Sequence, residues 1–235
     1  MLKIPPFILA LGALAVFATG CGTDHAKVRF VHAAPPPPPP DTQPNLDVAV
    51  DGKTVASDMA FGDVFPAADY LTVAAGNRRV EVRDTGNTND RINSTVDFAS
   101  QKVYTLLVSG KISDKSIAAV LKTDDNTAPP SGSIKLRVIH DSPGGPGQID
   151  VYVVAPGTDI TTVTPVISNL SYQQASVYED LPAATYEVVM TSSGAPADVR
   201  FDGTFPLAAG QVRTLVTLDI GGSGQMSALE LSDLN

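Results

Sequence analysis

The stretch Lys27-Val28-Arg29-Phe30-Val31-His32 decides the fold, because it returns 108 residues later as Lys135-Leu136-Arg137-Val138-Ile139-His140. In the first copy Val28, Phe30 and His32 share one face and Arg29 and Val31 the other, a period of two that is typical of half-buried β-strands. Four further segments match in the same order, among them residues 46–50 with 149–153 and 103–107 with 212–216. Matches that keep their order indicate an internal repeat.

The repeat predicts two domains, over residues 27–126 and 134–235, joined by a Pro- and Ser-containing linker at 127–133. Short apolar segments alternate with turn signals such as Asp51-Gly52 and Asp202-Gly203, and no segment has a helical period with caps. About seven short strands in each half leave no room for crossover helices. This pattern predicts an all-β fold of two tandem antiparallel immunoglobulin-like β-sandwich domains.

Both halves carry the same pair of markers. A first strand ends in His32-Ala33-Ala34-Pro35 or His140-Asp141-Ser142-Pro143, and a second strand begins with Asp47-Val48-Ala49-Val50 or Asp150-Val151-Tyr152-Val153. In these segments the chain resembles a bacterial family, the domain of unknown function (DUF) family 4397. The resemblance implies exported, often lipid-anchored, repeated β-domains. It brings no established activity, so it assigns no catalytic residue.

The N-terminus has the features of an export signal. Lys3 precedes a charge-free apolar run over residues 7–18, which is shorter than the roughly 20 residues of a membrane-spanning helix but suits a signal peptide. Ala18-Thr19-Gly20-Cys21 resembles a bacterial lipobox. The resemblance implies a signal peptide over residues 1–20, cleavage between Gly20 and Cys21, and a lipidated tether over residues 21–26. Ordinary cleavage after Gly20 without lipidation is the alternative.

A lipid on Cys21 sets the expected location. Acyl chains such as palmitate anchor a protein stably when two or more are attached, so we expect a membrane partner through Cys21 and a place in the cell envelope. Because Gly22 and not aspartate follows Cys21, the outer membrane is expected in a diderm cell, on its periplasmic or surface face.

Composition excludes several function classes. The formal net charge of −9 argues against a nucleic-acid partner. A single cysteine excludes a disulfide framework and Cys-rich metal sites. The sequence contains no Gly-x-Ser-x-Gly, His-Glu-x-x-His or phosphate-binding loop. We therefore expect no cofactor, no metal and no enzymatic activity.

His32, His140, Asp47 and Asp150 form the weak candidate site, because a histidine and a carboxylate together can catalyse proton transfer or bind a metal. Strand alternation places His32 and Asp47 on different sides of the sheet. The favoured interpretation is a buried strand-end histidine that bonds a loop backbone, and an exposed or turn-bonding aspartate.

Three other segments have two interpretations each. Residues 84–90 offer oxygen ligands for calcium, but an Asn- and Gly-rich hairpin loop explains them as well. Asp124 and Asp233 follow the last strand of each half and are interpreted as solvated ends. The prolines from Pro35 to Pro40 predict a polyproline II rod of roughly 19 Å, which suits a recognition element or, as favoured, a stiff lengthened loop.

The function expected from these features is that of a non-catalytic, lipid-anchored envelope protein for adhesion, scaffolding or assembly of an envelope complex. The alternative is a carbohydrate-binding surface module. Its stacking platforms would be Tyr70, Tyr172 and Tyr178, with Tyr152 toward solvent, because the chain has no tryptophan. A hydrolase that uses His32 or His140 is the least favoured hypothesis.

Overall fold

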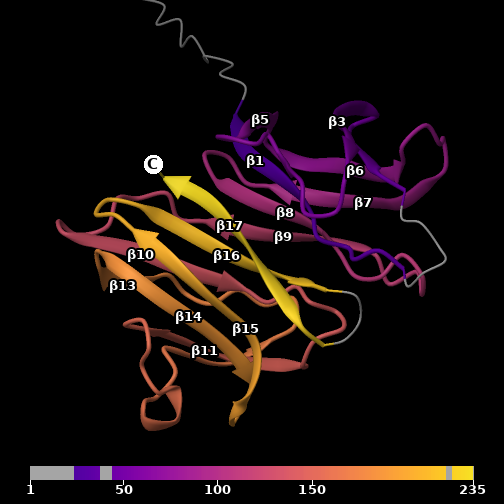
Figure 1. Cartoon of the computed structure of the whole chain (residues 1–235). Helices are drawn as coiled ribbons and strands as arrows, with labels where there is room; N and C mark the ends of the chain where they lie inside the picture. The colour runs from indigo at the N-terminus through magenta and orange to yellow at the C-terminus, as the bar shows by residue number, and fades with distance from the viewer. Residues whose placement is uncertain (1–23, 38–43, 221–223, 235) are drawn as a thin grey trace, which may run out of the picture.

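The computed structural model describes residues 24–37, 44–220 and 224–234, and β-strands make up nearly all regular structure there (Figure 1). A short 3₁₀ helix, η1 (Ile160–Thr162), is capped by the carboxylate of Asp159, which accepts from the Thr161 amide. Within these residues no helix has the length and apolar character to span a membrane. The prediction of an all-β fold of sandwiches is confirmed.

The first half is a sandwich of two sheets. One has the order β4-β1-β8-β9, with β5 also paired to β1, and the other has the order β3-β2-β6-β7. Apolar side chains such as Phe30, Leu46, Val80, Phe98 and Leu106 are fully buried between them. The strands are β1 (His25–His32), β2 (Leu46–Val50), β3 (Lys53–Met59), β4 (Val64–Phe65), β5 (Leu71–Ala74), β6 (Gly76–Asp84), β7 (Asp90–Phe98), β8 (Val103–Ser109) and β9 (Ala118–Asp124).

The second half repeats this strand order. Its sheets have the orders β13-β10-β16-β17 and β12-β11-β14-β15, and they enclose a second core around Ile134, Ile149, Val188 and Leu215. The strands are β10 (Ser133–Ile139), β11 (Gln148–Val154), β12 (Ile167–Ser171), β13 (Glu179–Pro182), β14 (Ala184–Ser192), β15 (Ala195–Leu207), β16 (Val212–Asp219) and β17 (Met226–Leu234).

Each sandwich contains one parallel pair of strands, which the antiparallel prediction does not include. β1 runs parallel to β8 from Lys27↔Val103 to His32↔Val108, and β10 runs parallel to β16. Parallel neighbours need a long crossover, and here the chain crosses to the other sheet and back between the two strands. The rest of the ladder pairs are antiparallel in the described residues.

The two sandwiches pack against each other through the outer faces of the β1/β8 and β10/β16 sheets (Figure 1). Val31 and Leu107 from the first half form one apolar cluster with Ile139, Val216 and Leu218 from the second. Strands β1 and β10 are therefore buried on both faces, whereas the alternating pattern predicts half-buried strands. The face that the sequence leaves to solvent is the interface between the halves.

Candidate functional site

Four charged side chains meet at one end of this interface. Arg29 on β1 pairs with Asp233 at the end of β17, and Arg137 on β10 pairs with Asp124 at the end of β9, at 2.6 Å. None of these side chains is more than 3% exposed. Each half thus supplies an arginine to a carboxylate of the other half, and the two ion pairs are reciprocal.

Neighbouring groups satisfy the other polar atoms of these side chains. The Arg29 Nε donates to Thr105 Oγ1 at 2.8 Å and its Nη1 to the Ser232 carbonyl at 2.8 Å. The Thr105 hydroxyl in turn donates to Asp124 at 2.7 Å. Arg137 makes the matching set with Thr214, the Thr123 carbonyl and, through Thr214, Asp233. Buried ion pairs stabilise a fold only when their remaining hydrogen bonds are satisfied in this way.

Two tyrosines complete the network. The Arg29 guanidinium lies 4.9 Å from the ring centroid of Tyr70, and Arg137 lies 4.6 Å from that of Tyr178. Their hydroxyls donate to Asp124 at 3.0 Å and to Asp233 at 2.7 Å. Burial, helped by the nearby carboxylates, raises the pKa of both phenols, so both stay protonated donors. Burial alone would lower the pKa of Arg29, but Asp233 and Asp124 outweigh it and raise that pKa.

The network corrects the interpretation of Asp124 and Asp233 as solvated strand ends. As whole residues they are only 7% and 4% exposed, and their side chains are fully buried, because each lies under the other half of the molecule. The tyrosines proposed as glycan platforms are likewise engaged within the protein, with Tyr172 bonded to Ser109 at 3.2 Å. Tyr152 is 4% exposed, so the expectation that it faces solvent is wrong.

Both candidate histidines are fully buried. The Nε2 of His140 donates to the Pro146 carbonyl at 2.8 Å, which fixes the tautomer, and its Nδ1 lies 3.0 Å from Thr217 Oγ1. Burial lowers the pKa of His140, and it lowers the pKa of His32 to about 4 against the opposing charge of Asp63. His32 packs edge-on against Phe61. Both rings are neutral at pH 7 and inaccessible to a substrate. This is the environment of a buried strand-end histidine, which is the favoured interpretation of the sequence.

Asp47 and Asp150 hold β-bulges on the neighbouring edge strands. The Asp47 carboxylate accepts from the amide of Asp58, and Asp150 accepts from the amide of Asn169. Asp58 and Asn169 have φ of 58° and 55°, a left-handed conformation found at bulges. The hydroxyls of Thr85 and Ser193 add to these contacts. The bulges interrupt the period of two in β3 and β12, and the sequence therefore predicts neither strand.

The histidines and aspartates do not come together as a catalytic pair. Each aspartate bonds a bulge and a hairpin at the sheet edge, whereas the ring of His140 bonds the Pro146 carbonyl and that of His32 packs on Phe61. Among the described residues no group of three or more His, Cys, Asp or Glu side chains could hold a metal ion.

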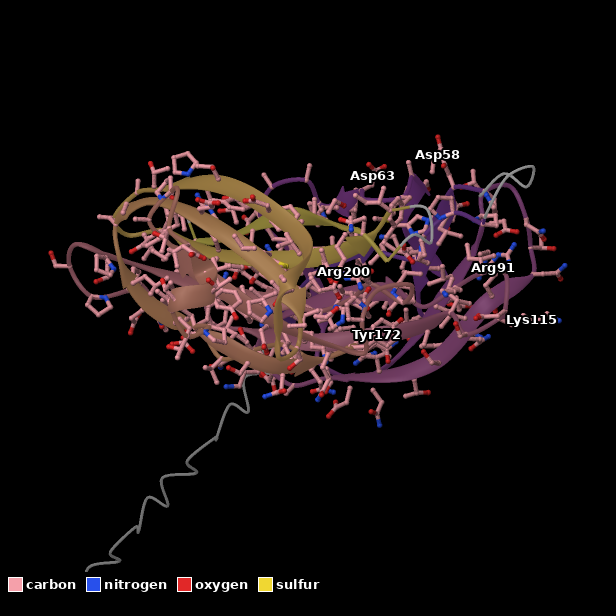
Figure 2. All side chains as sticks on the ribbon, turned by 60° about the horizontal axis from the view of Figure 1, so that its bottom comes forward. Asp58, Asp63, Arg91, Lys115, Tyr172 and Arg200 are labelled. Carbon is pink, nitrogen blue, oxygen red and sulfur yellow. The ribbon has the colours of Figure 1, made fainter. Side chains whose placement is uncertain are left out.

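The opposite end of the interface holds a buried acid that the sequence gives little reason to select. Asp141 has no exposed surface and accepts from the Ser109 hydroxyl at 2.5 Å, while its Oδ2 has no hydrogen-bond partner among the described residues. Gln173 also donates to Ser109, at 3.0 Å, and Tyr172 lies between the two halves (Figure 2). Burial raises the pKa of Asp141 to about 8, although Ser109 and Lys122 oppose the rise. The first half has Ala33 where the second has Asp141.

A cavity of about 490 Å³ opens beside the ion-pair network, between the two halves. One wall is the segment from Pro66 to Tyr70 and the other is β17 from Glu230 to Leu234. Lys27, Arg29 and Asn126 also line it. Its size is that of a small-molecule site. The sequence does not point to it, because its walls come from segments more than 150 residues apart.

The loop at residues 84–90, for which calcium binding was the alternative to a hairpin, has its carboxylates paired with arginines. Asp84 bonds Arg91 through both oxygens, and Asp90 bonds Arg83 at 2.9 Å. A second hollow, of about 570 Å³, lies between this loop and the segment after β8, and Arg91 and Lys115 point to the same side of the first half there (Figure 2). These pairs fit the hairpin interpretation of the loop.

Several predicted residues lie outside the described part of the chain. Gly20, Cys21 and the whole of residues 1–20 are among them, as are Pro38 to Pro40. Of the proline run, Pro35 is buried, Pro36 is exposed and Pro37 is intermediate.

Comparison with known proteins gives one family. The family model described as Domain of unknown function (DUF4397) matches residues 26–152. No curated protein matches the chain in sequence.

Several solved structures are similar to parts of the chain. The C-terminal domain of AlgF from P. aeruginosa is 17% identical, with a TM-score of 0.31, over 43% of this chain and 98% of that one. Family 41 carbohydrate-binding modules from streptococcal virulence factors, described in alpha-glucan recognition, are 12% identical with a TM-score of 0.27, over 86% of this chain and 96% of that one. A family 26 module of Eubacterium rectale Amy13K, in complex with maltoheptaose, is 8% identical with a TM-score of 0.26, over 87% and 95%. At these scores the likenesses do not define the topology, which follows from the strand pairing above.

Replacement of Arg29 by Met should unfold the protein at markedly lower urea concentration. The change leaves Asp233 buried without its partner, and breaking a buried pair costs about 3–5 kcal/mol. Arg91→Met is the matched control, because the Arg91 pair with Asp84 lies near the surface and such pairs contribute about 1 kcal/mol or less. Equal losses of unfolding free energy in the two variants would contradict a structural role for the buried network.

The free energy of unfolding should decrease as the pH rises, and replacement of Asp141 by Asn should make this decrease smaller. The folded-state pKa of about 8 lies above the ordinary value of 3.8, so between these values the folded chain binds a proton that the unfolded chain has released, and stability falls as pH rises. Wild-type urea midpoints should decline from about pH 4 to pH 8 more steeply than those of Asp141→Asn.

Asp150→Asn provides the control of opposite sign. Burial opposes ionisation of Asp150, but hydrogen bonds from Gly194, Asn169 and Ser193 outweigh it and lower its pKa. The contribution of ionised Asp150 to the free energy of unfolding is fully present above its pKa in the unfolded chain. It is lost as the pH falls through the lower pKa of the folded chain. A pH profile of Asp141→Asn that parallels the wild type from pH 4 to 8 would show that Asp141 is not the group responsible.

Proposed function

The chain belongs to the family described as Domain of unknown function (DUF4397), and we propose that it is a non-catalytic binding or scaffolding protein of the cell envelope. In this proposal acyl chains on Cys21 hold it to a membrane, and the two sandwiches form one rigid body next to that membrane. Adhesion and assembly of an envelope complex are both compatible with such a body.

The proposal rests on one observation: the side chains that could take part in catalysis are used to hold the structure together. The arginines, aspartates and tyrosines of the interface bond one another across the two halves. A general base has to reach a proton of the substrate, whereas His32 and His140 have no exposed surface. The polar chemistry of the described residues thus supports a rigid body more than a reaction centre, and the hydrolase hypothesis is not favoured.

The geometry near the N-terminus also suits a membrane-attached body. Strand β1 begins at His25, so four residue steps separate it from Cys21, a reach of roughly 14 Å at most. With net charge −9, attraction to anionic lipid would not hold the protein. The attachment therefore depends on the acyl chains.

Replacement of Cys21 by Ser should release the protein from membranes, because the thioether that carries the lipid can no longer form. Fractionation of cells that express the full chain should place the wild type with membranes and Cys21→Ser in the soluble fraction, and only the wild type should incorporate labelled palmitate. Gly22→Ser, which keeps Cys21, is the control and should stay with membranes. Retention of Cys21→Ser in the membrane fraction would overturn the anchor.

A further inference from the structure

We propose that the interface between the two halves is a pH-controlled hinge, which opens at the Asp141 end when Asp141 loses its proton and stays joined at the ion-pair network. This inference goes beyond the binding or scaffolding function above and does not depend on the membrane anchor. It concerns the place where Asp141 of the second half bonds Ser109 of the first.

The two halves form this contact twice, and the two versions differ in polarity. In one version the three side chains are apolar and lie in the cluster that both halves share. In the other version a carboxyl, a hydroxyl and an ammonium group occupy the equivalent places. The strand register relates Ala33 to Asp141, Leu218 to Ser109 and Leu231 to Lys122. A change of pH therefore acts on one version of the contact and leaves the apolar version as it is.

Asp141 fits the closed interface as a neutral carboxyl group. It has no exposed surface, its Oδ1 contacts the Ser109 hydroxyl, and its Oδ2 bonds no other described group. A buried carboxylate needs a bonded cation or several hydrogen-bond donors to offset the loss of its hydration. Burial accordingly raises the pKa of Asp141 to about 8, although the Ser109 hydrogen bond and the charge of Lys122 oppose the rise.

The titratable groups that face Asp141 do not replace this missing partner. Lys122 on β9 is the cation that acts on Asp141, but it forms no ion pair among the described residues. Tyr172, from the segment after β12, is a neutral phenol whose pKa is raised mainly by burial. His140 precedes Asp141 and is neutral because burial lowers its pKa. An ionised Asp141 is thus a buried charge, and opening of the interface would hydrate it.

The other end of the interface remains joined because it is held in two ways. Arg29 and Arg137 pair with carboxylates of the opposite halves, and guanidinium groups keep their charge throughout the neutral range. The chain also crosses from one half to the other here, since β9 ends at Asp124 and β10 begins at Ser133. The linker between them therefore lies at the pivot of the hinge.

The expected pH dependence has a definite size. In the open form Asp141 is hydrated and takes its ordinary pKa of 3.8, whereas in the closed form its pKa is about 8. Between these values the closed form binds a proton that the open form has released. The equilibrium constant for opening should therefore rise about tenfold for each pH unit and level off above pH 8.

The test measures how readily a buried thiol at this interface reacts. Ala33→Cys, in the full mature chain that also carries Cys21→Ser, places the thiol in the cluster between the halves. Ala56→Cys places it in the core of the first sandwich, and Ala209→Cys in an exposed turn. Dithiodipyridine is kept dilute, so that each labelling rate divided by that of Ala209→Cys reports an opening equilibrium.

We expect the normalised labelling of Ala33→Cys to rise about 1,000-fold from pH 5 to pH 8. It should exceed that of Ala56→Cys at every pH, because the halves separate without unfolding. Addition of Asp141→Asn should abolish the rise. Asp202→Asn is the matched control, because it removes an exposed carboxylate on β15, and it should leave the rise unchanged.

Three results would overturn the hinge. Equal labelling of Ala33→Cys and Ala56→Cys would show that the thiol reacts by unfolding of the whole chain. A rise that persists with Asp141→Asn would show that another group controls opening, and absence of a rise would remove the pH control altogether. Ala175→Cys, which packs against the same cluster, takes the place of Ala33→Cys should circular dichroism show the latter unfolded.

Discussion

The reciprocal ion pairs of Arg29 with Asp233 and of Arg137 with Asp124 determine how the two halves are joined. Apolar contacts between sheets are not directional, so the cluster around Val31 and Val216 by itself permits many orientations. Burial of an ion without its partner costs several kcal/mol. Only the orientation that completes both pairs at once avoids this cost, and it therefore fixes the register of one sandwich on the other.

The sequence predicts the features that depend on neighbouring residues and fails where the partner lies far along the chain. The alternation in Leu46–Val50 and the repeated Lys27–His32 pattern are local signals of strands and of a repeat. Burial of Asp233 depends on Arg29, 204 residues earlier in the chain, and burial of Asp124 depends on Arg137 in the other half. A lone aspartate after a strand is ordinarily solvated. The sequence does contain a signal for this: Arg29 and Arg137 recur in the otherwise apolar stretches Val28–Val31 and Leu136–Ile139. A strand buried on both faces has a nearly continuous apolar sequence.

The Asp-Val-x-Val segment acquires a structural explanation from the bulges. Asp47 and Asp150 accept backbone amides of residues with positive φ on the neighbouring strand and hydroxyls of the next hairpin. A carboxylate at the start of the second strand is thus required by the bulge and not by a reaction. The same holds for His140, whose ring joins the strand end to the Pro146 carbonyl. Residue type and spacing cannot distinguish these uses from catalysis, because the distinction depends on exposure.

The repeat separates the positions that hold the body together from those free to specialise. At the network the two halves carry the same side chains, Arg29 and Arg137, Thr105 and Thr214, Tyr70 and Tyr178, Asp124 and Asp233. They differ beside it. Leu234 in the second half occupies the place of Asp125 in the first, and three additional residues precede Tyr70. An ion pair that needs both halves cannot vary in one of them alone, whereas a wall beside it can. The two halves therefore share the network and differ in the segments that line the cavity beside it.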